Sequence, residues 1–140
     1  MEKVTKMRRN GCALEVLLLL YLVASLVHFA HNAEFVGTYP NLPAWITRSS
    51  VYGTWLAITS IGVAGYLLHR QGLRVLGFGL LCVYAALGLD GLLHYTRAPP
   101  GAHSHGMNFT IWFEVAIAFT LLAYLTVRAR TLTMRRWSSP

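Results

Sequence analysis

Residues 12–30 read CALEVLLLLYLVASLVHFA, an apolar run in which Glu15 is the only charged residue. At about 1.5 Å per residue, an α-helix of this length crosses a hydrocarbon core of about 30 Å. Because a helix satisfies its own backbone hydrogen bonds inside lipid, the run predicts a transmembrane helix. A basic stretch before an apolar run also describes a signal peptide, but no small-x-small cleavage pattern follows this one.

Three further apolar runs follow the first. Prolines, which disfavour helix, lie in the first connector (Pro40, Pro43) and in the last (Pro99, Pro100). With 55% hydrophobic and 12% charged residues, the 140-residue chain is too apolar for an ordinary soluble domain. We therefore expect an all-α integral membrane protein, with residues 1–140 forming one transmembrane domain folded as an up-down-up-down four-helix bundle. The predicted helices cover about residues 12–31, 44–68, 73–95 and 107–127.

The basic residues, which give the chain a formal net charge of +7, gather in alternate connectors. The positive-inside rule places such connectors in the cytoplasm. We therefore expect a multi-pass membrane protein with both termini cytoplasmic. The bacterial inner membrane is the expected compartment, although positive-inside orientation alone does not separate it from a eukaryotic membrane. The expected partner of the protein is the lipid bilayer and not a nucleic acid. The three clusters are Lys3, Lys6, Arg8 and Arg9, then Arg70 and Arg74, then Arg128, Arg130, Arg135 and Arg136.

Histidines and acids gather instead toward the opposite, outer side of the predicted bundle. His28 and His31 are three residues apart and Asp90 and His94 are four apart, so each pair projects from one helical face. Imidazole and carboxylate groups are ligands for zinc, copper and non-haem iron. The pattern predicts a transition-metal centre held by His28, His31, Asp90 and His94. Glu114, two turns into the fourth helix, is expected to be a further ligand or a catalytic acid or base.

One local resemblance concerns the same residues. The stretch Asp90-Gly91-Leu92-Leu93-His94, followed by His103 or His105, resembles the copper site in one subunit of the particulate methane and ammonia monooxygenases. That site combines an aspartate-x-x-x-histidine motif with a distal histidine, and the resemblance implies copper as the metal. The spacing to the distal histidine differs here, so the prediction keeps zinc and non-haem iron beside copper.

Other interpretations of the same residues stay open. Asp90 could pair with Arg48, which is expected at a similar depth, and His103 and His105 could be ordinary interfacial residues. The leading functional prediction is metal-dependent chemistry on a small or lipid-soluble substrate. The alternatives are a b-type haem held by His28 and His94, an accessory subunit of a larger membrane complex, and a metal-free acid/base enzyme acting on sterol- or terpene-like substrates. The sequence alone does not decide whether the chain is an enzyme.

Overall fold

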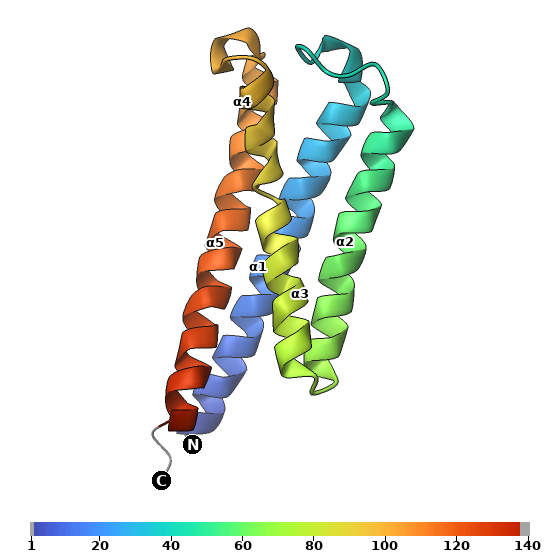
Figure 1. The fold of residues 1–140 in the computed structure, drawn as a ribbon. Helices are drawn as coiled ribbons and strands as arrows, with labels where there is room; N and C mark the ends of the chain where they lie inside the picture. Colours follow the sequence, from blue (N-terminus) through green and yellow to red (C-terminus); the bar gives the residue numbers. More distant parts are fainter. Residues whose placement is uncertain (1, 138–140) are drawn as a thin grey trace.

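The computed structural model describes residues 2–137, with side chains described from residue 12 to residue 130, and every regular element in that range is a helix (Figure 1). Four helices are long and four are short one-turn elements. The long helices are α1 (Glu2–Glu34), α2 (Arg48–Arg70), α3 (Arg74–Leu87) and α5 (His105–Trp137). The short elements are η1 (Val36–Thr38), η2 (Asp90–Leu93), α4 (His94–Arg97) and η3 (Pro100–Ala102).

Four helical stretches are long and apolar enough to span a membrane, which confirms the predicted number and type of elements. They are Cys12–Glu34, Arg48–Arg70, Arg74–Arg97 and His105–Arg130. The second stretch begins later than the predicted residue 44 because Thr47 caps the helix. The Thr47 hydroxyl accepts a bond from the Ser50 amide, and the Ser50 hydroxyl accepts one from the Thr47 amide. This reciprocal capping box satisfies two backbone donors and sets the first turn at Arg48.

The four long helices alternate in direction. The described chain begins and ends at one end of the bundle, and the α1–α2 and α4–α5 connections lie at the other, which we call the distal end (Figure 1). Each long helix packs on two neighbours, in the order α1, α2, α3, α5 and back to α1. Every element that carries a predicted site residue therefore reaches the distal half of the bundle.

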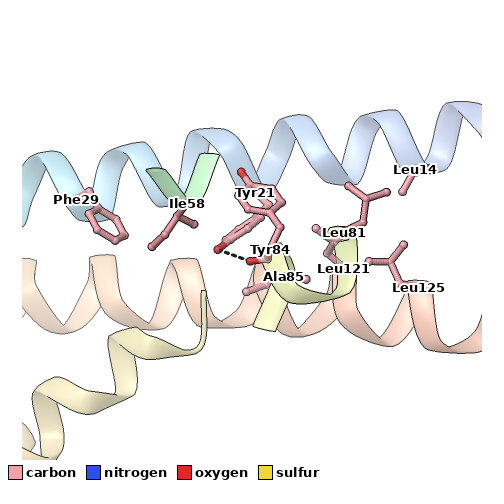
Figure 2. Close-up of a cluster of buried hydrophobic side chains, with 10 residues drawn as sticks. Leu14, Tyr21, Phe29, Ile58, Leu81, Tyr84, Ala85, Leu121 and Leu125 are labelled. Carbon is pink, nitrogen blue, oxygen red and sulfur yellow. Dashed lines mark hydrogen bonds between the residues drawn. The ribbon is translucent and has the colours of Figure 1, made fainter. Parts of the chain in front are cut away.

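The core at mid-bundle is apolar with one tyrosine pair at its centre (Figure 2). Tyr21 of α1 is fully buried, and its hydroxyl donates to the backbone carbonyl of Tyr84 in α3 over 3.2 Å. The two rings lie 4.5 Å apart between centroids. Leu81 and Leu121, which are also fully buried, continue this layer toward the termini. The pair fixes α1 against α3 just below the polar residues of the distal end.

Glycines allow α2 and α3 to touch backbone to backbone. A Cβ placed on Gly77 would lie 2.4 Å from the amide nitrogen of His69 and 2.7 Å from the carbonyl oxygen of Gly65. No side chain fits at that distance, since the opposing atoms belong to backbone. Small residues at helix crossings are the usual means of close packing between membrane helices.

The predicted continuous helix over residues 73–95 is interrupted in the structure. α3 ends at Leu87, and the chain continues through Gly88 and Leu89 into the 3-10 turn η2. Gly88 lies at the break, and the close approach of the Tyr21 hydroxyl leaves no room there for a Cβ. Glycine is also a poor helix former. As a result Asp90 and His94 do not share the face of one α-helix.

Candidate functional site

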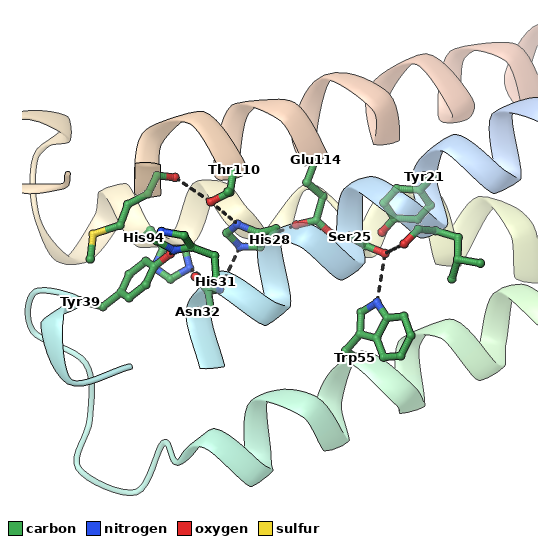
Figure 3. Close-up of polar contacts among 12 residues, drawn as sticks. Tyr21, Ser25, His28, His31, Asn32, Tyr39, Trp55, His94, Thr110 and Glu114 are labelled. Carbon is green, nitrogen blue, oxygen red and sulfur yellow. Dashed lines mark hydrogen bonds and ion pairs between the residues drawn. The ribbon is translucent and has the colours of Figure 1, made fainter. Parts of the chain in front are cut away.

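Polar side chains from three elements meet inside the distal half of the bundle (Figure 3). His28 and Asn32 are four residues apart on α1, and Thr110 and Glu114 are four apart on α5, so each pair shares one helical face. His94 enters from the start of α4. All but His94 are buried. The bundle interior thus holds a polar cluster, which we define as these five residues.

The hydrogen bonds of the cluster fix the tautomer of His28. Thr110 donates its hydroxyl proton to the carbonyl of Met107 over 3.1 Å, so it can only accept from the His28 ring. The His28 Nδ1 atom lies 3.4 Å from that hydroxyl oxygen and is therefore the protonated nitrogen of the neutral ring. This leaves His28 Nε2 as the unprotonated nitrogen, whose lone pair can accept a hydrogen bond or bind a metal ion.

Two imidazole nitrogens converge on one amide nitrogen. Asn32 Nδ2 lies 3.0 Å from His28 Nε2 and 3.3 Å from His94 Nε2, and its two hydrogens can serve both. The His28 and His94 rings are 5.5 Å apart between centroids and nearly perpendicular. Both Nε2 lone pairs consequently point to the position that the Asn32 amide occupies.

Glu114 is the most costly group of the cluster. Its side chain is fully buried, and neither carboxylate oxygen has a hydrogen-bond partner. The closest basic atom is His28 Nε2, which lies 3.7 Å from Oε2, beyond hydrogen-bonding distance. A buried carboxylate is stable only when it is protonated or paired with a cation. The cluster therefore needs a positive charge at this point or a proton on Glu114.

A cavity of about 230 Å³ lies against the cluster, between α1, the α1–α2 connection, the start of α2 and η2. His28, Asn32, Asp90 and His94 line its polar side. The rest of the wall is mainly apolar and includes Phe29, Leu42, Trp45, Ile46 and Val51. The structure thus places Asp90 among the residues that line this cavity together with His28 and His94.

His31 takes no part in the cluster. Its Nδ1 atom lies 2.9 Å from the hydroxyl of Tyr39 in the α1–α2 connection, and its ring packs on Phe35. Burial raises the pKa of Tyr39 from its ordinary value of 10.0 to about 12, so the phenol stays neutral and can donate this bond. The predicted pairing of His28 with His31 at one point does not form in this arrangement.

Arg48 pairs with Glu34, and the predicted alternative in which it neutralises Asp90 is wrong. The Arg48 guanidinium lies 2.6 Å from Glu34 Oε1, and the Tyr52 hydroxyl donates to the same oxygen over 2.9 Å. Glu34 is the last residue of α1 and Arg48 the first of α2, so the connection brings them together. Asp90 lines the cavity from η2, and Arg48 is not among the lining residues.

The two loop histidines differ. His103 is buried, with Nδ1 bonded to the carbonyl of Pro99 over 3.1 Å and Nε2 without a partner. Its ring lies 6.2 Å from that of His94 between centroids. His105 is exposed at the start of α5. Of the two distal histidines in the resemblance to the copper site, His103 is the one that lies next to His94.

Asn32 and Thr110 are functional candidates that our sequence prediction missed. The signal was present, since Asn32 follows His28 by four residues and Thr110 precedes Glu114 by four. We considered only imidazole, thiol and carboxylate groups as site residues. An amide and a hydroxyl prove to be the side chains that connect them.

As the side chains stand, no three histidine, cysteine or acidic groups within the described range are close enough together to hold a metal ion. The metal centre therefore stays a prediction, now with His28, His94 and Glu114 as its nearest members. Comparisons with protein-family models, with curated proteins and with solved structures found no match. Any assignment of function has to come from the cluster itself.

Proposed function

We propose that this chain is a multi-pass inner-membrane protein that binds a transition-metal ion between His28, His94 and Glu114. One observation carries the proposal. The Nε2 atoms of both histidines converge on the amide nitrogen of Asn32, while the buried Glu114 carboxylate beside them has no hydrogen-bond partner. A divalent cation at this position would accept both lone pairs and neutralise the carboxylate.

The membrane assignment is supported by apolar side chains on the outside of the bundle. Leu19, Leu56 and Val75 are each more than half exposed, on three different helices. Such a surface suits lipid and is unfavourable in water.

The basic clusters favour cytoplasmic termini. A reporter fused after Pro140 should then be cytoplasmic, and a tag inserted between residues 99 and 103 should be accessible from outside; a tag protected in intact cells would refute this orientation.

The second observation in favour of an ion is the hydrogen bond behind His28. Metal-binding histidines usually donate their other ring nitrogen to an oxygen acceptor, which orients the ring and fixes the tautomer. The Thr110 hydroxyl is such an acceptor at His28 Nδ1. Binding would require the Asn32 side chain to rotate away from the two Nε2 atoms, and its Oδ1 atom is not held by any hydrogen bond that would oppose this.

The donor set restricts the ion and what it could do. Two imidazoles with one carboxylate suit zinc, copper or non-haem iron, and such sites keep an open position in catalytic proteins. An ion with an open position would supply Lewis-acid chemistry beside the cavity. The 5.5 Å separation of the His28 and His94 rings favours a single ion over haem b, since a porphyrin would have to enter between them.

Elemental analysis of the protein purified in mild detergent tests the proposal. We expect about one transition-metal ion per chain for a single mononuclear centre. The double variant His28→Ala/His94→Ala should lose it, whereas His105→Ala, which removes an exposed histidine outside the cluster, should retain it. Equal metal content in wild type and the double variant would refute the proposal.

A role as a subunit of a larger membrane complex is the second candidate. The exposure of α2 favours this role. Only 11% of its 18-residue apolar segment is buried inside the bundle, whereas 33–39% of the corresponding segment is buried in each of the other three membrane-spanning stretches. A partner subunit could cover this helix. Mild-detergent purification from the native membrane would separate the two candidates. A lone, metal-loaded chain would argue for independent action, and stable co-purification with other membrane chains for a complex.

A further inference from the structure

The cavity beside the polar cluster has the features of a binding site for a small amphiphile. Its volume of about 230 Å³ lies just below the range of about 300–1,000 Å³ that is usual for small-molecule sites. Its wall is mainly apolar, and His28, Asn32, Asp90 and His94 form a polar side. Ser50 and Thr54 line it from α2, but their hydroxyls already donate to the backbone carbonyls of Thr47 and Ser50. A molecule with an apolar body and one polar end matches this division.

Asn32 and Asp90, which line the cavity, carry acceptor oxygens, and rotation of the Asn32 side chain would turn its enclosed Oδ1 atom toward a ligand. The Oδ1 atom of Asn32 is buried and has no partner, and a buried acceptor without a donor is costly. Asp90 also lines the cavity. A ligand that donates a hydrogen bond would satisfy the Asn32 oxygen, whereas a hydrocarbon would leave it unpaired.

The position of the cavity favours entry of a neutral molecule from the membrane. Trp45, which is 75% exposed, and Ile46 line it from the connection that precedes α2. A tryptophan at a helix end is typical of the membrane interface. A neutral alcohol can partition to that depth, while a charged amine pays a large desolvation cost.

We propose that this cavity binds a small lipophilic alcohol or phenol, with its hydroxyl group at Asn32 and Asp90 and its body against Phe29, Leu42, Ile46 and Val51. The proposal goes beyond ion binding and does not require it, since the acceptors and the apolar wall are present without an ion. An ion at His28 and His94 would face the hydroxyl end of the ligand.

Thymol, a phenol of suitable size, and p-cymene, the same skeleton without the hydroxyl, provide a matched pair of probes. Saturation-transfer NMR on the full chain in lipid nanodiscs measures their binding, with empty nanodiscs as the blank. We expect saturable thymol binding, and binding of p-cymene that is at least about tenfold weaker because it cannot donate a hydrogen bond. Equal, unsaturable signals for both probes, matching the blank, would overturn the proposal.

Variants that fill the cavity provide a second test of the proposal. Val51→Phe places a larger side chain in its wall from α2, and Ile46→Phe does so from the connection, in case the helix variant folds poorly. Val63→Phe is the control, because Val63 is an exposed residue of α2 that does not line the cavity. Both cavity variants should weaken thymol binding at least about tenfold, and the control should bind like wild type. Unchanged thymol affinity in folded cavity variants would overturn the proposal.

Metal analysis of the same samples separates this inference from the proposed function. Saturable thymol binding by metal-free protein would support the cavity and count against the ion site. Metal-loaded protein that does not distinguish thymol from p-cymene would overturn the cavity proposal and leave the ion site standing.

Discussion

The close contact between α2 and α3 makes Gly77→Ala the most sharply determined perturbation of the fold. The new methyl group would sit 2.4 Å from the His69 amide nitrogen and 2.7 Å from the Gly65 carbonyl oxygen. Ordinary contacts of a Cβ begin near 3.4 Å, so the two backbones would have to separate by about 1 Å. Overpacking of this kind costs about 1–3 kcal/mol in the free energy of unfolding.

Gly79→Ala is the matched control for this variant. Gly79 lies two residues further along α3, and a Cβ there meets no atom within 4 Å. Since alanine is the better helix former by about 1 kcal/mol, the control should be as stable as wild type or slightly more stable. Reversible unfolding by sodium dodecyl sulfate in mixed micelles, followed by circular dichroism, measures both. The reasoning is refuted if the two variants unfold alike.

Three further predictions concern the cluster and its surroundings. Glu114→Gln should lower zinc affinity at least about tenfold in titration calorimetry, yet not destabilise metal-free protein, because it removes a buried charge; a stability loss without an affinity loss would contradict this. Thr110→Val should lower affinity about 10–100-fold by releasing His28 Nδ1; unchanged affinity would exclude the orienting role. Tyr39→Phe should cost about 0.5–1.5 kcal/mol of thermal stability at neutral pH. That deficit should shrink as pH rises from 10 toward 12, because the phenol ionises near pH 10.0 in the unfolded chain and only near pH 12 in the folded one. A deficit that stays constant over this pH range would contradict the prediction.

The number and type of helices follow from the sequence because apolar runs of this length have no other stable form in lipid. The ends of the helices depend on local chemistry, such as the Thr47 cap, that a hydropathy pattern does not contain. The break after Leu87 was not predicted, because a single glycine such as Gly88 is compatible with a continuous helix. The need for glycine at residue 88 comes from a tertiary contact, the approach of Tyr21 from α1.

The site was predictable only to the extent that helical periodicity controls it. His28 and His94 were expected at similar depth, with Glu114 converging on them from the fourth helix, and the structure places His28 next to both. Periodicity could not exclude His31, which the Tyr39 hydroxyl holds away from the cluster. That contact depends on how the α1–α2 connection folds back.

The same connection decides the partner of Arg48. Arg48 and Asp90 were expected at similar depth, but depth alone does not fix which acid an arginine meets. Glu34 and Arg48 end and begin successive helices, so the fold of the intervening segment brings them to 2.6 Å. Ion pairs at helix ends therefore need the loop conformation, which the sequence pattern does not supply.

The coordination shell of the bound ion tests the central claim most directly. Full-length protein is loaded with one equivalent of zinc, and its X-ray absorption is recorded at the zinc edge. The account predicts two imidazole nitrogens and carboxylate oxygen at about 2.0–2.2 Å, with the imidazole signal lost in His28→Ala/His94→Ala. A shell of oxygen atoms alone, or a spectrum that is the same in the double variant, would contradict it.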